Sequence, residues 1–158
     1  LIPDAMMIEM IDARLDEPDC RNGAIFDGFP RTSAQAVALD EMLKRKSLPL
    51  KAVIELTVDE EALVGRITGR YSCANCGAGY HDEFQRPAVP GVCDACGHQD
   101  FKRRPDDNEA TVRDRLEIYR RDTAPIIPHY EAQGLVQRVD GMAEITEVEG
   151  AVATILDA

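Results

Sequence analysis

Apolar side chains recur every three or four residues over long parts of the chain and predict its helices. After Pro3-Asp4, the spacing of Met6, Met10 and Ile11 predicts a helix that ends near Glu17-Pro18. The same period predicts further helices at residues 34–46 with Ser33 as the cap, at residues 60–70 with Asp59 as the cap, from Asp107 or Asn108 through a break at Thr123-Ala124-Pro125, and at residues 143–156.

Three short apolar runs lie between these helices and predict strands. They are Ala24-Ile25-Phe26, residues 52–56 and residues 135–139. Runs of this kind are typical of strands that are buried on both faces of a parallel sheet. Because strands alternate with helices along the chain, the pattern predicts an α/β fold in which helices flank a parallel sheet.

The character of the sequence changes between Tyr71 and Arg104, where glycine, proline and cysteine are frequent and the helical period is lost. We interpret residues 71–104 as a small inserted module. Residues 1–70 and 105–158 then form the core domain.

Composition limits the classes to which the protein can belong. Its 158 residues are 44% apolar, enough for one domain with a core. No apolar run approaches the roughly 18 residues of a membrane span, so we expect no membrane partner. The net charge of −11 argues against nucleic acid as a partner, because a phosphate backbone would repel such a surface.

The basic residues are mostly arginine, with 14 arginines against 4 lysines. A guanidinium binds phosphate and carboxylate with two parallel N–H groups, whereas lysine acts as a point charge. The bias therefore suggests an anionic ligand; genomic base composition is the alternative explanation.

Four of the five cysteines form two pairs, Cys73-x2-Cys76 and Cys93-x2-Cys96, sixteen residues apart. This spacing is typical of a tetrahedral four-thiolate zinc site, because two intervening residues let both sulfurs of a pair face one ion. Four thiolates close the coordination shell, so the zinc would be structural; iron or cobalt could take its place. Two disulfides are the alternative, which a reducing cytoplasmic location would disfavour.

Three other side chains could bind a metal but are not needed for the four-cysteine site. We expect His81 and His98 to lie on the surface, and Cys20 to be a buried or idle thiol.

The segment Asp27-Gly28-Phe29-Pro30-Arg31 follows the first predicted strand. Ligands of open α/β sheets bind outside the carboxyl ends of the strands. There Asp27 could hold Mg²⁺, directly or through water, and Arg31 could bind a phosphate. The alternative is an ordinary β-to-α turn with a salt bridge.

Arginines also gather at both ends of the inserted module. Arg66 and Arg70 lie one helical turn apart before it, a spacing that destabilises a helix unless an anion lies between the charges. Arg104 follows the module, and Arg113 and Arg115 come soon after. We interpret the arrangement as a phosphate site with a lid; solvated surface charge is the alternative.

Together these motifs resemble the adenylate kinase family, in its zinc-containing bacterial form with a long lid. The resemblance covers nearly the whole chain and rests on residues 27–32, residues 65–70, the four-cysteine insert, and the segment from Arg104-Pro105-Asp106-Asp107 to Arg115. It implies part of a P-loop NTPase-like parallel sheet with an inserted zinc-ribbon-like lid. It also implies the reaction ATP + AMP ⇌ 2 ADP, with Mg²⁺ accompanying ATP, in a monomeric cytoplasmic enzyme.

The resemblance further implies roles for individual residues. The implied AMP contacts are Leu1, Ile2, Gly28, Phe29, Pro30, Arg31, Gln35, Arg104 and Arg115. The implied ATP contacts are Arg66, Arg70, Gly79, Tyr80 and Ala143. The implied catalytic residues are Arg31, Arg70, Arg104 and Arg115, with Asp27 in the magnesium shell and Asp106 and Asp107 holding these arginines.

Within that set, Gln35 would face the adenine of AMP. Its amide can accept a hydrogen bond from N6 and donate one to N1, a pattern that an oxo-purine would not satisfy.

The sequence departs from the family at one motif, the Gly-x4-Gly-Lys-Ser/Thr phosphate loop. Gly23 and Gly28 have the spacing, but Phe29-Pro30 stand where lysine and serine or threonine belong. We therefore expect the chain to be the C-terminal portion of an enzyme, inactive and unstable alone, with residues 1–4 as the end of the AMP-binding flap. The alternatives are another nucleoside monophosphate kinase, a non-catalytic zinc-ribbon interaction module, or a structural protein derived from a kinase.

Overall fold

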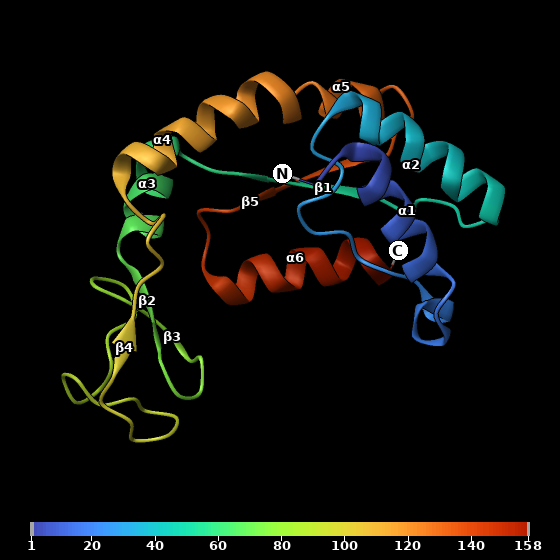
Figure 1. Ribbon diagram of the computed structural model, residues 1–158. Helices are drawn as coiled ribbons and strands as arrows, with labels where there is room; N and C mark the ends of the chain where they lie inside the picture. Colours follow the sequence, from blue (N-terminus) through green and yellow to red (C-terminus); the bar gives the residue numbers. More distant parts are fainter. Residues whose placement is uncertain (1, 158) are drawn as a thin grey trace. The chain divides into compact units, whose positions relative to one another are not determined.

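The computed structural model describes residues 2–157 of the chain. The backbone forms two compact units (Figure 1): unit 1 spans Leu1–Thr57 and Ile118–Ala158, and unit 2 spans Val58–Glu117. Within residues 2–157, no helix has both the length and the apolar character that crossing a membrane requires.

Unit 1 contains a parallel pair of strands, β1 (Val53–Thr57) and β5 (Val136–Asp140). Helix α6 lies on one side of this pair and α5 on the other (Figure 1), so the prediction of a parallel sheet flanked by helices is confirmed. The helical segments of unit 1 are α1 (Asp4–Leu15), the 3-10 turn η1 (Pro18–Asn22), α2 (Ser33–Lys46), the π-helical turn η2 (Tyr119–Thr123), α5 (Ile126–Glu131) and α6 (Ile145–Asp157).

Helix α2 lies at the centre of the apolar core of unit 1. Leu39 and Met42, both about 1% exposed, pack against Phe29 and the apolar side of α1. Ala36 faces another neighbour, Tyr130 of α5, near the strands. Burying a large aliphatic side chain contributes about 1.5–3 kcal/mol, so this helix anchors the elements around it.

Helix starts follow the capping chemistry predicted from the sequence, with one correction. Asp59 accepts a hydrogen bond from the backbone N–H of Ala62, as expected. The cap of α2 is Thr32 rather than Ser33, since the Thr32 hydroxyl accepts from the N–H of Gln35. Two hydroxyl residues in a row leave the sequence ambiguous by one position.

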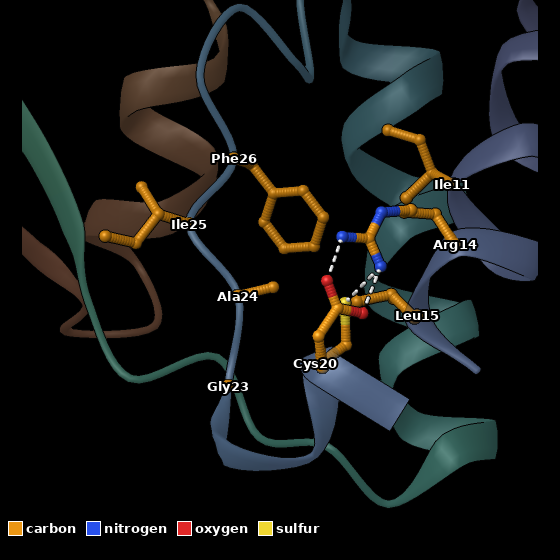
Figure 2. Close-up of a pocket in the computed structure, with 9 residues that line it drawn as sticks. Ile11, Arg14, Leu15, Cys20, Gly23, Ala24, Ile25 and Phe26 are labelled. Atoms are coloured by element: carbon orange, nitrogen blue, oxygen red, sulfur yellow. Dashed lines mark hydrogen bonds and ion pairs between the residues drawn. The ribbon is translucent and has the colours of Figure 1, made fainter. Parts of the chain in front are cut away.

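The predicted strand at residues 24–26 is absent from the structure. This segment pairs with no strand among residues 2–157, and Ile25 is 81% exposed. Figure 2 shows the segment passing close to α1, with Phe26 turned towards Arg14 and Ile25 turned away. Apolar character predicts burial, but a strand also needs a hydrogen-bonded neighbour, which a pattern of side chains cannot supply.

Cys20 lines a hollow beside this segment, together with Ile11, Leu15 and Phe26. It is neither fully buried nor idle. Its sulfur accepts a hydrogen bond from Arg14 Nη1 at 3.1 Å, while the guanidinium binds both carboxylate oxygens of Asp19 (Figure 2).

Unit 2 contains a small antiparallel sheet between two helices. Strand β2 (Arg70–Cys73) pairs with β3 (Gly79–His81) on one side and with β4 (Phe101–Lys102) on the other. The helices are α3 (Glu60–Thr68) before the sheet and α4 (Glu109–Ile118) after it. The three strands thus connect the two cysteine pairs to the helices.

The expectation that His81 lies on the surface is wrong. The residue is 9% exposed, and its Nδ1 accepts the backbone N–H groups of Glu83 and Phe84. Because Nδ1 accepts, Nε2 carries the proton and donates to the Gly65 carbonyl at 3.2 Å. His81 is therefore a structural histidine whose ring links β3 to α3.

Gly69→Ala should destabilise unit 2, because this fixed imidazole leaves no room for a methyl group. A Cβ at residue 69 would lie 2.5 Å from Cε1 of His81. We expect a loss of about 1–3 kcal/mol in the free energy of unfolding, the usual cost of overpacking, measured by urea titration.

Gly65→Ala is the matched control, since a Cβ there meets nothing within 4 Å. Its helix propensity should stabilise by up to about 1 kcal/mol. Equal stability of the two variants would contradict the packing argument.

Candidate functional site

The four cysteines of the two pairs converge in unit 2. Their sulfurs all lie within 4.8 Å of one another. The sulfurs of Cys73 and Cys96 are 3.6 Å apart, and those of Cys76 and Cys93 are 3.5 Å apart. A disulfide would need about 2.05 Å, so the disulfide alternative is wrong and the cysteines are free thiols.

The sulfur arrangement fits a tetrahedral metal ion. Zinc–sulfur bonds of about 2.3 Å place thiolates about 3.8 Å apart at the corners of a tetrahedron. Each pair also forms the tight turn that such a site needs: the N–H of Gly77 donates to the carbonyl of Cys73, and that of Gly97 to Cys93. Both glycines have a positive φ, 78° and 72°, which favours glycine at these positions.

Several donors surround the sulfurs. The hydroxyl of Tyr80 donates to Cys93 Sγ at 3.4 Å and accepts from the N–H of Asp94 at 2.7 Å. The hydrogen bond from Tyr80, followed by backbone N–H groups, lowers the pKa of Cys93 to about 6. The N–H of His98 and the side chain of Asn75 lower the pKa of Cys96. Hydrogen bonds with the neighbouring sulfurs raise the pKa of Cys76 to about 12, because the four sulfurs are crowded together. Thiolate is the form that binds metal, so a bound cation would favour deprotonation of this crowded set.

Tyr80 forms part of the support beneath this cluster. Its ring stacks on Tyr71 at 5.8 Å, and Phe101 meets both rings edge-on at 5.5 Å. The side chain is 7% exposed, so little of it is open to a ligand, whereas the backbone of Gly79 is exposed.

Arg70 and Asp107 form a two-pronged ion pair in unit 2. Arg70 Nε and Nη2 donate to the two carboxylate oxygens at 2.7 and 2.8 Å. The Asp107 side chain is 1% exposed, and the Arg70 side chain is 39% exposed. The hydrogen bond to Arg70 holds the pKa of Asp107 below its ordinary value of 3.8, with further help from the charges of Arg104 and Arg115.

The prediction that Asp106 and Asp107 hold arginines is confirmed for two of them. Asp107 binds Arg70, and Asp106 binds Arg115 Nη1 at 3.3 Å on the surface. Arg104 is exposed near Asp107. Arg113 instead ties α4 to α3 through a double hydrogen bond to Glu61 at 2.8 Å.

In unit 1, the loop after Phe26 shapes the environment of Arg31. Arg31 Nε donates to the carbonyl of Gly28 at 2.6 Å, and the backbone carbonyl of Arg31 accepts from the hydroxyl of Thr123. Gly28 has a φ of 76°, and a Cβ there would lie 2.8 Å from Arg31 Nη2. The positive φ favours glycine at this position. The Gly28 carbonyl orients the guanidinium through Nε, and among residues 2–157 no hydrogen bond from either Nη atom is seen.

Gln35 lies in the first turn of α2 with its amide held at both ends. Oε1 accepts from the backbone N–H of Arg31 at 2.7 Å, and Nε2 donates to Asp4 Oδ1 at 2.7 Å. Asp4 was not singled out from the sequence, because it lies 31 residues away and no short-range pattern links the two. The residue is 8% exposed.

The remaining predicted site residues differ in their exposure to solvent. Asp27 is exposed, Pro30 is half-buried beside buried Phe29, and Ile2 is 48% exposed. Leu1 lies outside the described residues. Ala143 and Arg66 are half-buried, in units 1 and 2 respectively.

Comparison with known proteins decides the family. A model of the adenylate kinase family matches residues 1–135. The chain belongs to the adenylate kinase family. The matched region includes all of unit 2 and most of the predicted nucleotide contacts, so the resemblance to the adenylate kinase family is confirmed.

Curated relatives support the same assignment. An adenylate kinase of Rhizorhabdus wittichii is 60% identical over 157 residues, which cover 99% of this chain and 73% of that protein. One from Zymomonas mobilis is 59% identical over 156 residues, covering 99% and 70%. One from Novosphingobium aromaticivorans is 55% identical over 158 residues, covering 100% and 73%.

Asp107→Asn should lower the free energy of unfolding at neutral pH and make that free energy depend less on pH in the acidic range. The folded-state pKa of Asp107 is lowered, so its contribution is present above the unfolded value of 3.8 and is lost as the pH falls through the folded value. We expect a loss on the order of 1–2 kcal/mol at pH 7, where the charge-assisted hydrogen bonds are intact. The difference from wild type should shrink below about pH 4, as measured by urea unfolding across pH.

The neighbouring Asp106→Asn is the control. Its ion pair is more than half exposed on both sides, and exposed pairs contribute little. A difference between Asp107→Asn and wild type that stays constant with pH would show that the ion pair is not its cause.

Proposed function

We propose that the intact enzyme to which these residues belong catalyses reversible phosphoryl transfer, ATP + AMP ⇌ 2 ADP. Family membership supports phosphoryl transfer to a nucleoside monophosphate. The observation that favours AMP as the acceptor is the buried amide of Gln35, which lies beside Arg31 and offers both a donor and an acceptor to a base. A zinc-ribbon interaction module is not favoured, because the family match over residues 1–135 also includes β1 and helices α1, α2 and α5 of the core.

The proposed chemistry needs no protein nucleophile. An oxygen of the AMP phosphate attacks the γ-phosphorus of ATP in line, and the protein contributes positioning and charge. We assign Arg31 to the phosphate of AMP, and Arg66 and Arg70 to the phosphates of ATP. Gly28, Phe29, Pro30 and the backbone of residues 1–2 would contact AMP; Arg104 and Arg115 would act on the transferred group, and Gly79, Tyr80 and Ala143 on ATP.

Magnesium bound with ATP would supply further neutralisation of phosphate charge. Asp27 fits a role in its shell, because its carboxylate is exposed at the start of the loop that orients Arg31. We propose that Asp27 contacts the magnesium ion through a bound water molecule.

We further propose that Cys73, Cys76, Cys93 and Cys96 hold a structural zinc ion within a lid of residues 71–104. Four thiolates fill the shell, so the ion would stabilise the module without touching substrate. The cluster of three aromatic rings is the module's main apolar support. So small a core rarely holds a segment together without a metal or a disulfide.

We also propose that ATP, AMP and ADP are the partners of a monomeric cytoplasmic enzyme that binds neither nucleic acid nor membrane. Residues 1–70 and 105–158 would form its core domain.

Arg31→Lys and Arg70→Lys test the assigned arginine roles. Lysine cannot reproduce the planar, two-pronged contact with phosphate. Each substitution should lower kcat by more than about tenfold, which corresponds to about 1.4 kcal/mol in the transition state. The rate is measured with the intact enzyme, as ADP formed from ATP and AMP.

Arg45→Lys is the matched control. Arg45 lies in the last turn of α2, and its exposed guanidinium forms an ion pair with Asp12 of α1. The kcat of this variant should match wild type. Near-normal turnover in both site variants would refute their catalytic roles.

Cys93→Ala should abolish stoichiometric zinc and lower the melting temperature, because metal binding contributes directly to folding of a small module. Activity well below the new melting point should fall only modestly. Zinc is measured by metal analysis of the purified protein, and stability by thermal unfolding.

Cys20→Ala is the control for loss of a thiol outside the cluster, and it should keep its zinc. A zinc-free Cys93→Ala protein that is fully stable but inactive would show instead that the ion is catalytic.

A further inference from the structure

The orientation of the Gln35 amide depends on two partners that differ in chemistry. The backbone N–H of Arg31 can only donate, and it lies 2.7 Å from Oε1. The carboxylate of Asp4 accepts when ionised, and it lies 2.7 Å from Nε2. Both contacts are satisfied in one orientation of the amide.

Rotating the amide by half a turn would make both contacts unfavourable. The NH₂ group would then face the N–H of Arg31, and the carbonyl oxygen would face the carboxylate of Asp4. A buried amide that loses its partners in this way carries the full cost of desolvation. The two neighbours therefore fix which end of Gln35 is the donor and which is the acceptor.

The fixed amide keeps spare capacity for a ligand. Its oxygen has a second lone pair, and its nitrogen has a second proton. The unused pair consists of an acceptor next to a donor. That pattern complements a 6-aminopurine, whose N6 donates and whose N1 accepts, whereas a 6-oxopurine presents an acceptor at O6 and a donor at N1.

We propose that Asp4 is a specificity-determining positioning residue, which orients the Gln35 amide and thereby selects a 6-aminopurine monophosphate over a 6-oxopurine one. The inference rests on the proposed role of Gln35 in the AMP site. Asp4 acts through Gln35 and is not assigned a contact with the nucleotide.

Asp4 is suited to this role by its position at the start of α1. The helix begins with Pro3 as its N-cap, whose side chain makes no capping hydrogen bond. The carboxylate of Asp4 instead bridges to α2, where it gives Gln35 a charged acceptor. Hydrogen bonds to charged groups are about twice as strong as neutral ones, so this partner holds the amide more firmly than a neutral side chain would.

Asp4→Asn tests the proposal with little change in shape. An asparagine can accept from Nε2 or donate to Oε1, so it no longer distinguishes the two orientations of Gln35. We expect the ratio of kcat/KM for AMP to kcat/KM for inosine monophosphate to fall by about tenfold, or about 1.4 kcal/mol. Asp4→Ser is a second variant in case the first does not fold. The serine hydroxyl can also either donate or accept, so this variant should lower the same ratio.

Asp12→Asn is the matched control, because Asp12 also links α1 to α2 but through Arg45 and Lys46. It should lower stability and leave the AMP-to-inosine-monophosphate ratio unchanged. An unchanged ratio in Asp4→Asn, or an equal fall in both variants, overturns the proposal, since a role in helix packing alone would not alter base selectivity.

Gln35→Leu separates this inference from the function on which it rests. If Gln35→Leu raises the KM for AMP more than that for ATP while Asp4→Asn leaves the ratio unchanged, only the role of Asp4 fails. If Gln35→Leu affects both nucleotides equally, the adenine-binding role of Gln35 itself is wrong, and the role of Asp4 falls with it.

Discussion

The ion pair between Arg70 and Asp107 is the constraint on which the organisation of unit 2 depends. Its two residues are 37 positions apart, at the start of β2 and just before α4, so it closes the base of the segment that contains all four clustered cysteines. With both ends held, β2 can pair with β3 and β4, and the cysteine turns are brought together. A buried carboxylate is costly without a partner, so Asp107 requires Arg70 as much as it directs it.

The two units achieve stability by different means. Unit 1 buries aliphatic side chains around α2, with Leu39 and Met42 almost wholly enclosed. The module in unit 2 has three aromatic rings, a set of sulfurs and a fixed histidine, His81. A fold of the first kind tolerates exchange of one apolar residue for another of similar volume. A fold of the second kind depends on individual donors and acceptors, so single polar substitutions should affect it more.

Local chemistry made much of this structure predictable from the sequence, and contacts between distant residues account for the rest. The strands at 53–57 and 136–140, the Asp59 cap and the cysteine cluster follow from short patterns. The strand predicted at residues 24–26 is wrong because pairing is a property of two segments. The burial of His81 and the contact of Asp4 with Gln35 were missed for the same reason.

The candidate site residues share one physical design, in which part of each side chain's hydrogen-bonding capacity is used inside the protein. Gln35 uses one lone pair and one N–H on Arg31 and Asp4. Arg31 uses Nε on the Gly28 carbonyl, and Arg70 uses Nε and one proton of Nη2 on Asp107. The internal bonds remove rotational freedom before a ligand arrives, so less conformational entropy is lost on binding. The groups that remain for a ligand are the Nη atoms of the arginines and the second lone pair and N–H of the Gln35 amide. The internal hydrogen bonds fix their orientation before a ligand binds. Specificity and stability therefore draw on the same few bonds.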